Sequence, residues 1–295
     1  MIISVLKESQ DPRVALIPKT VAKLVKEGYS VWMESNAGAR AFFTDEAFQE
    51  AGASVHSRAD ILKESDILLC IAPPDKEVAE GLKSGAITIL VESPDPNSGL
   101  ADTLTSNSTK GFSLYDLPRT TRAQAMDVLS SMANIAGYRA VLIAASHLPR
   151  YFPLLMTAAG TIPPARVLVL GAGVAGLQAI ATARRLGARV EAFDVRAATK
   201  EEVESLGAKF VEVEGADDNQ TSGYAKEQSK EFLDRQRAVI REHIAMADVV
   251  ITTAQVRGRK APILVDEEAL GNMKSGAVIV DLAASSGGNC VRTED

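Results

Sequence analysis

Short apolar segments alternate with longer segments of helical periodicity along the first 115 or so residues of the chain. The short segments are rich in Ile, Leu and Val, which is typical of buried strands in a parallel sheet. Strands that alternate with helices in this way predict a doubly wound α/β domain. The expected strands are residues 2–6, 31–33, 67–71, 86–91 and 111–114.

A second series of strands follows a long segment without helix breakers, residues 121–147, in which Gly137 is the single interruption. At about 1.5 Å per residue this helix would be about 40 Å long, and we expect it to join two domains with a ligand cleft beside it. The predicted fold is two doubly wound, Rossmann-like parallel-sheet domains, residues 1–128 and 129–295. The strands expected in the second domain are residues 167–170, 189–193, 210–213, 249–252 and 277–281.

The first strand of the second domain runs directly into a G-x-G-x-x-G motif. Gly171 permits a sharp turn, Gly173 lets a pyrophosphate approach the backbone, and Gly176 lets the next helix pack closely. The free N–H groups at Val174 and Ala175 and the helix dipole favour phosphate at this point. Because strand, turn, helix and second strand occur in this order, the motif predicts a dinucleotide site rather than a simple helix-capping turn.

The second strand of this unit ends at Asp194, Val195 and Arg196, which we expect at the adenosine ribose. Asp194 can accept hydrogen bonds from a ribose 2′-OH and would repel a 2′-phosphate. Arg196 is a competing signal, because a guanidinium could pair with that phosphate. The acid at the strand tip favours NAD(H) over NADP(H).

Residues 214–228 are polar, contain two glycines and lack an apolar period. A loop of this length in an α/β unit is often a lid, so we interpret it as a mobile loop with Tyr224 as its one large side chain. A plain solvated insertion is the alternative.

Composition and charge exclude several classes of function. The chain has 46% hydrophobic and 24% charged residues and a net charge of −6, which argues against a nucleic-acid partner. Its two cysteines are far apart, and no residues have the spacing of metal ligands. No run of about 18 apolar residues predicts a membrane span, and the N-terminus lacks the pattern of a signal peptide.

Residues 117–139, LPRTTRAQAMDVLSSMANIAGYR, closely resemble the NAD(H)-binding component, domain I, of proton-translocating NAD(P) transhydrogenases. Residues 156–183, 223–227 and 278–290 carry further similarity, so the resemblance covers almost the whole chain. It implies direct hydride transfer from NADH to NADP+ held by a separate NADP(H)-binding component. A membrane proton channel couples this transfer to proton translocation in the family. The resemblance also implies a homodimer and a peripheral location on the cytoplasmic side of the inner membrane, or the mitochondrial matrix side.

The same resemblance implies residues for the nicotinamide end of the site and for the loop. The family's nicotinamide-side motif corresponds to Arg119, Gln124, Asp127 and Ser130, and its mobile-loop tyrosine to Tyr224. Of these, Arg119, Gln124 and Asp127 are the expected catalytic residues, which align two nicotinamide rings without donating a proton. On a helix, Gln124, Asp127 and Ser130 would share one face. The alternative interpretation is a helix N-terminus with polar caps.

Alanine dehydrogenases are the second candidate class, since they share the two-domain plan and the glycine motif. Their catalytic lysine and histidine have no evident counterparts here, where residues 71–74 read IAPP and residues 91–94 read VESP. A third hypothesis is an NAD-sensing module without chemistry. In transhydrogenases the chain continues past GGNC with a further strand and helices that pack on the first domain, so we expect that domain to be incompletely covered.

Overall fold

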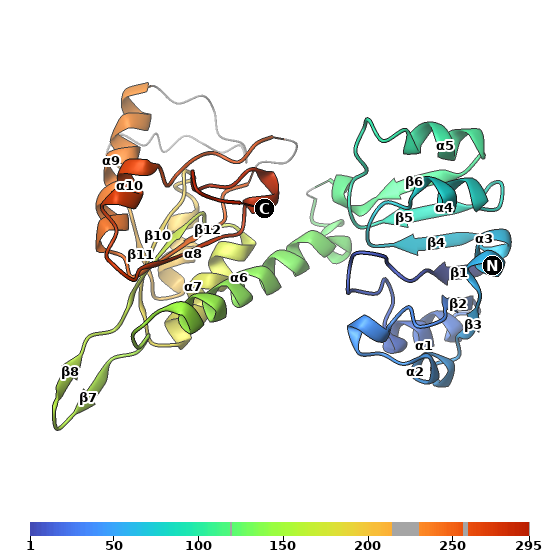
Figure 1. The fold of residues 1–295 in the computed structure, drawn as a ribbon, viewed down its shortest axis with the longest axis horizontal. Helices are drawn as coiled ribbons and strands as arrows, with labels where there is room; N and C mark the ends of the chain where they lie inside the picture. Colours follow the sequence, from blue (N-terminus) through green and yellow to red (C-terminus); the bar gives the residue numbers. More distant parts are fainter. Residues whose placement is uncertain (119, 214–229, 256–258, 295) are drawn as a thin grey trace. The chain divides into compact units, whose positions relative to one another are not determined.

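The computed structural model describes residues 1–118, 120–213, 230–255 and 259–294 of the chain. The chain divides into two units, Met1–Leu129 and Ser130–Asp295. Each unit is built on one parallel sheet (Figure 1). Apolar side chains cluster on both faces of each sheet. This confirms the predicted fold class, which is α/β with two parallel sheets and a long helix in the chain between them.

Six parallel strands form the sheet of the first unit, in the order β3-β2-β1-β4-β5-β6. The order reverses at β1, as in doubly wound sheets, so Ile3 pairs with Val31 on one side and with Ile67 on the other. Edge strand β3 was not expected from the sequence. The strands are β1 (Ile2–Val5), β2 (Ser30–Glu34), β3 (Ser54–His56), β4 (Ile67–Cys70), β5 (Ile87–Leu90) and β6 (Lys110–Ser113).

Short helices pack on both faces of this sheet, and side-chain caps fix where three of them begin. Thr44, Ser57 and Asp75 each accept a hydrogen bond from the N–H three residues further on, as helix N-caps do. The helices are α1 (Pro18–Lys26), α2 (Asp45–Glu50), α3 (Arg58–Glu64), α4 (Lys76–Gly81) and α5 (Leu100–Ser106), with 3-10 turns η1 (Ala39–Ala41), η2 (Leu114–Asp116) and η3 (Gln124–Met126).

The long helix α6 (Val128–His147) begins seven residues later than the sequence pattern predicts. Residues 124–126 form η3 instead, and Asp127 has ψ 82°, outside the helical range. Asp127 therefore directly precedes the helix, a position where aspartate is favoured because a carboxylate can accept hydrogen bonds from the N–H groups of the first turn. The expected continuous helical face through Gln124, Asp127 and Ser130 is wrong.

Five parallel strands form the sheet of the second unit, in the order β11-β10-β9-β12-β13, again with the reversal at its first strand. The strands are β9 (Arg166–Leu170), β10 (Arg189–Phe193), β11 (Lys209–Phe210), β12 (Val249–Thr252) and β13 (Val278–Asp281), and the helices are α7 (Val174–Arg185), α8 (Thr199–Ser205), α9 (Lys230–Met246) and α10 (Glu267–Gly271), with the 3-10 turn η4 (Ala284–Ser286). Strand β11 is shorter than expected, since residues 211–213 leave the sheet.

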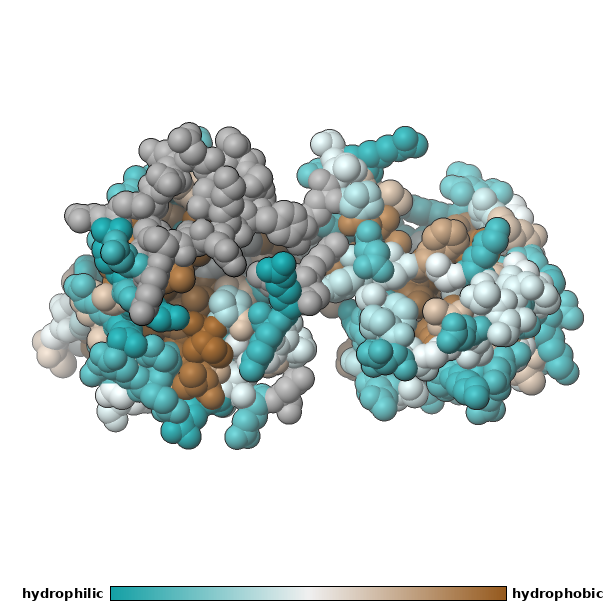
Figure 2. Space-filling view, turned by 90° about the horizontal axis from the view of Figure 1, so that it is seen from above, coloured by the Kyte–Doolittle hydropathy of each residue, from teal (hydrophilic) through white to brown (hydrophobic). Residues whose placement is uncertain are grey.

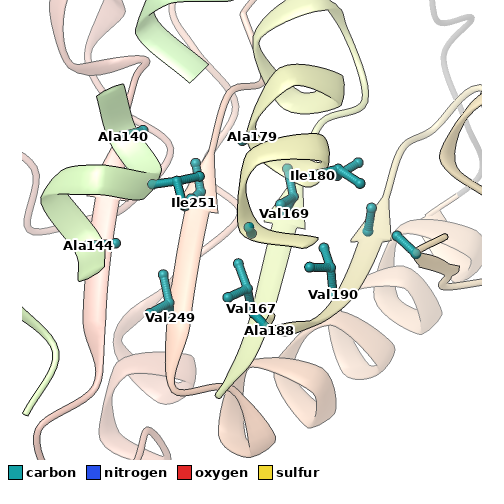
Figure 3. Packing of buried hydrophobic residues seen from close by; sticks show 14 of the residues in the cluster. Ala140, Ala144, Val167, Val169, Ala179, Ile180, Ala188, Val190, Val249 and Ile251 are labelled. Atoms are coloured by element: carbon teal, nitrogen blue, oxygen red, sulfur yellow. The ribbon is translucent and has the colours of Figure 1, made fainter. Parts of the chain in front are cut away.

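The core of the second unit lies on both faces of its sheet. On one face, side chains of α6 and α7 pack on the central strands, with α9 and α10 on the other. In Figure 3, Ala140 and Ala144 of α6 point toward the strand that carries Val249 and Ile251. Small residues on α6 thus let the helix lie close to the sheet. Within the described residues α6 is the one helix long and apolar enough to suit a bilayer, and these contacts make it a core helix.

An antiparallel hairpin of β7 (Leu155–Thr157) and β8 (Gly160–Ile162) projects from the second unit (Figure 1). The sequence did not predict it. Its side chains are largely exposed, with Met156 71% accessible. In Figure 2 the described surface is largely hydrophilic, and hydrophobic residues gather in places on both units.

Candidate functional site

The three motif glycines of the turn between β9 and α7 have different surroundings. Gly171 has φ +105°, and a Cβ there would lie 2.5 Å from Thr253 Oγ1. A Cβ on Gly176 would lie 1.8 Å from the carbonyl oxygen of Gly171, so the helix touches the turn backbone to backbone. Among the residues that the structure describes, a Cβ on Gly173 would have nothing within 4 Å. Gly173 therefore leaves open space above the turn, where a phosphate group fits.

The start of α7 has the features of an anion site. Gly173 is the N-cap and offers no side-chain acceptor to the first N–H groups, and the first turn carries no acidic residue. The last turn carries Arg184 and Arg185, which complement the negative end of the helix dipole. Val174 is 43% exposed, so the first turn is accessible, and with its free N–H groups it can bind phosphate oxygens.

Asp194 lies at the carboxyl end of β10 and holds the glycine turn. Its Oδ2 accepts a hydrogen bond of 2.8 Å from the N–H of Ala172, between the first two motif glycines. Only 7% of its side chain is exposed. The sequence motif and the acid about 20 residues further on are thus brought together, as a dinucleotide site requires.

Arg196 folds back onto the same carboxylate. Its Nε donates to Oδ1 at 2.9 Å and its Nη2 donates to Oδ2 at 3.0 Å, and its backbone N–H also donates to Oδ1 at 2.9 Å. The carboxylate hydrogen bond raises the pKa of Arg196, against the lowering effect of burial. The two signals that compete in the sequence, for a ribose hydroxyl and for a 2′-phosphate, are therefore one ion pair.

A buried network that the sequence did not reveal ties the loops after β12 and β13 to the glycine turn. Asn289 is fully buried; its Oδ1 accepts from the N–H of Ala254, and its Nδ2 donates to the carbonyl oxygens of Ala254 and Pro262. Next to Ala254, Thr253 donates from Oγ1 to the carbonyl oxygen of Gly171 at 3.0 Å. Asn289 is thus linked to the glycine turn through Ala254 and Thr253.

Asp281 holds the loop that contains Asn289. Its carboxylate accepts five hydrogen bonds, two of them from the N–H groups of Asn289 and Cys290. Burial alone would raise the pKa of Asp281, but the donors together lower it below its usual range. The segment at residues 278–290 carries the family resemblance. Its hydrogen bonds to the loop after β12, however, join Thr252 to Asp281, 29 positions apart, and Ala254 to Asn289, 35 positions apart, and no local pattern in the sequence reveals them.

Helix α6 also contacts the first turn of α7, next to the glycine turn. Gly137 lies against the first turn of α7, where a Cβ would be 2.0 Å from the carbonyl oxygen of Ala175. One turn earlier, Asn134 donates from Nδ2 to Oε1 of Gln178 at 3.1 Å. The glycine that interrupts the long apolar segment is therefore a close-approach residue.

The residues expected at the nicotinamide end have different outcomes. Gln124 lies in η3 and Asp127 precedes α6, both in the first unit, whereas Ser130 begins the second unit. Asp127 and Ser130 each take part in interactions within the structure. Arg119 and Tyr224 lie outside the described residues. The assignment of this group to the nicotinamide end therefore stays a prediction.

Neither cysteine has the environment of a nucleophile. Both are buried, and desolvation raises the pKa of Cys70 to about 12, so its thiol stays protonated. Within the described part of the chain, no group of three His, Cys, Asp or Glu side chains is arranged to hold a metal ion. The glycine turn, the start of α7 and Asp194 together form a surface that could hold a dinucleotide.

Comparison with known proteins identifies the family. The model of the alanine dehydrogenase/PNT C-terminal domain matches residues 140–295, and that of the N-terminal domain matches residues 4–136. An NAD(P) transhydrogenase alpha-subunit chain of Rhodospirillum rubrum is 46% identical, over all of this chain and 79% of its own length. A solved transhydrogenase structure from Sinorhizobium meliloti is 44% identical with a TM-score of 0.87, over 98% of this chain and 80% of that one.

Alanine dehydrogenases are more distant. That of Mycobacterium tuberculosis is 31% identical, over 94% of this chain and 70% of its own length. The match to the transhydrogenase subunit of Rhodospirillum rubrum has the higher identity and covers all of this chain, which confirms the resemblance found from the motifs. The chain belongs to the alanine dehydrogenase/PNT family and, within it, to the NAD(P) transhydrogenase alpha subunits.

Proposed function

We propose that this chain binds NAD(H) and presents it for direct hydride transfer to or from NADP(H) held by a separate component of a transhydrogenase. The observation that carries the proposal is the hydrogen bond from Ala172 N–H to Asp194, which joins a glycine turn to a ribose-binding acid. It occurs in a chain that matches a transhydrogenase alpha subunit along its whole length.

The residues present fit such a cofactor. The N–H groups at the start of α7 would hold the pyrophosphate above Gly173, where the turn has open space. Asp194 would accept a ribose hydroxyl. The bound nicotinamide supplies the hydride chemistry, and the protein supplies position and orientation.

At the reacting end, we assign alignment of the nicotinamide to Arg119, Gln124, Asp127 and Ser130, on the strength of the family resemblance. Hydride transfer between two nicotinamide rings needs their reacting carbons about 3–3.5 Å apart and aligned. It needs no general acid, unlike the reduction of a carbonyl group. An amide, a carboxylate, a hydroxyl and a guanidinium suit this task because they can fix a carboxamide and its ribose in one orientation. We assign Tyr224 to cofactor binding on the same ground, as the counterpart of the family's loop tyrosine.

The test is a reconstitution. The chain is mixed with an NADP(H)-binding component, and reduction of an NAD analogue by NADPH is followed spectroscopically. We expect transfer only when both proteins are present, and a large loss of rate with a modest loss of binding in Gln124→Asn. Binding of NADH without any transfer would support a sensing module instead. NADH oxidation by the chain alone with pyruvate and ammonium would support an alanine dehydrogenase.

We further propose that the active form is a homodimer. It would bind the membrane part of the enzyme as a peripheral component on the cytoplasmic side of the inner membrane, or the mitochondrial matrix side. The exposed hairpin supports the dimer. Apolar side chains at and beside its two strands are exposed to solvent, namely those of Leu154, Met156 and Ile162, and a second copy of the chain could cover them. Sedimentation should give the mass of a dimer, and Met156→Lys should shift it toward the monomer. A monomeric wild-type chain at micromolar concentration would contradict this aspect of the proposal.

A further inference from the structure

The pair of Asp194 and Arg196 places two opposite specificity elements on one carboxylate. The acid is the recognised partner of an unmodified ribose, whereas an arginine close by is the usual partner of a 2′-phosphate. Here Nε and Nη2 of the arginine bind both carboxylate oxygens in a fork, the geometry in which a guanidinium also binds phosphate. While the fork is closed, the phosphate-binding face of the arginine is in use.

We propose that Arg196 is a latent receptor for the 2′-phosphate of a dinucleotide and that Asp194 keeps it from acting as one. This rests on the proposed function, since it concerns the ribose end of the same site. The specificity for NAD(H) then belongs to the pair. Asp194 both repels the phosphate and holds the cation that would otherwise attract it.

The exposures of the two side chains support this arrangement. The side chain of Asp194 is 7% exposed and that of Arg196 is 40% exposed, so a ligand that arrives from solvent meets the arginine first. The backbone of Arg196 is fixed, because its carbonyl oxygen accepts from the N–H of Thr199 at 3.1 Å and from its hydroxyl at 2.8 Å. Release from Asp194 would therefore free the side chain and leave its attachment point at the ribose end.

Neighbouring charges do not take over the role of Asp194. Glu202 in the first turn of α8 attracts Arg196 only as a charge without a hydrogen bond. It raises the pKa of Arg196 less than Asp194 does. Lys200, the nearby cation on α8, is paired with Glu212. Of these two described cations, Arg196 is thus the one that removal of Asp194 would make available.

The test uses two fragments that differ only at the 2′ position, ADP-ribose and 2′-phospho-ADP-ribose, with affinities for the full chain measured by calorimetry. The proteins are the wild type, Asp194→Asn, Arg196→Met and the double variant. Asparagine keeps an acceptor for the N–H of Ala172 and removes the charge. Circular dichroism checks that each variant is folded.

We expect the wild type to prefer ADP-ribose. Asp194→Asn should bind the phosphorylated fragment at least about tenfold more tightly than the wild type does, the effect of one hydrogen bond to a charged group. The gain should disappear in the double variant and shrink as salt is raised. Arg196→Met alone should favour ADP-ribose at least as strongly as the wild type.

Three results would overturn the inference. They are no gain in Asp194→Asn, a gain that persists in the double variant, and a shift toward the phosphorylated fragment in Arg196→Met. The second would mean that relief of repulsion by Asp194 explains the whole effect. Failure of the wild type to bind ADP-ribose at all would instead contradict the proposed function, so the two failures are distinguishable.

Discussion

The α-carbon of Gly137 faces the carbonyl oxygen of Ala175 so closely that a Cβ on the glycine would lie 2.0 Å from that oxygen. Helix α6 therefore meets the first turn of α7 backbone to backbone, directly below the free N–H groups that we assign to the pyrophosphate. The hydrogen bond from Asn134 to Gln178 fixes the register of the same contact. The position of Ser130, two turns earlier on α6, depends on this close approach.

Gly137→Ala should therefore damage the site although alanine is the better helix former. The methyl group must displace α7 or α6, at a cost of about 1–3 kcal/mol for overpacking, against a gain of about 1 kcal/mol in helix propensity. We expect hydride transfer to fall more than NADH affinity, because alignment tolerates less displacement than binding. Gly271→Ala on α10 is the control, since a Cβ there meets no described residue within 4 Å. Urea unfolding and reconstituted transfer rates measure both effects. Equal rates in wild type and Gly137→Ala would show that the contact does not set the site.

The motif glycines Gly173 and Gly176 should respond to alanine in opposite ways. Gly176→Ala places a methyl group 1.8 Å from a backbone oxygen, so we expect a loss of stability at the upper end of the overpacking range, about 3 kcal/mol. The methyl group of Gly173→Ala meets no atom of the described residues within 4 Å, so the variant should leave the melting temperature almost unchanged. It should weaken NADH binding, because the methyl group occupies the space for the pyrophosphate. Thermal melts with and without NADH separate the two, and normal NADH affinity in Gly173→Ala would place the phosphates elsewhere.

Much of this fold could be predicted because burial leaves a local signal. The apolar runs of β9 and β12 are buried on both faces, so their composition alone indicates parallel strands. The glycine turn was predictable because the steric needs of Gly171 and Gly176 follow from its geometry. The start of α6 was not, because the polar residues around Asp127 suit a helix interior and a helix N-terminus alike.

Other features depend on contacts between distant residues and leave no local pattern. The hairpin at residues 155–162 has an exposed surface without the alternation of apolar and polar positions that marks a half-buried strand. Asn289 looks like a loop residue in the sequence, and its burial follows only from hydrogen bonds to Ala254 and Pro262. The closed pair of Asp194 and Arg196 was also out of reach, since the sequence allows either residue to face a ligand.

Asn289→Ala should loosen the loop after β12 and, through it, the glycine turn. It leaves the N–H and carbonyl groups of Ala254 and the carbonyl of Pro262 without their partner, and each unsatisfied buried group costs about 1–3 kcal/mol. We expect reduced NADH affinity and faster amide exchange at Thr253 and Ala254. The exposed Asn272→Ala serves as the control and should change neither. Slow exchange at Ala254 in the Asn289 variant would remove the proposed coupling.

Asp281 should make the second unit sensitive to acid. Its pKa in the folded protein is lowered by the hydroxyl and backbone donors around it, which outweigh the opposite effect of burial. In the unfolded chain the value returns to about 3.9, so below that pH the unfolded state binds more protons and stability falls as pH falls. The stabilisation is fully present above about pH 4–5 and is lost as the pH drops toward the lower folded-state pKa.

In Asp281→Asn the donors lose their charged acceptor, so we expect the free energy of unfolding to fall by about 1–3 kcal/mol at pH 7, and this loss to become smaller toward pH 3. Urea unfolding across this range, with Asp102→Asn at an exposed carboxylate as the control, measures the difference. A gap between wild type and Asp281→Asn that stays constant with pH would show that the charge of Asp281 does not hold this loop.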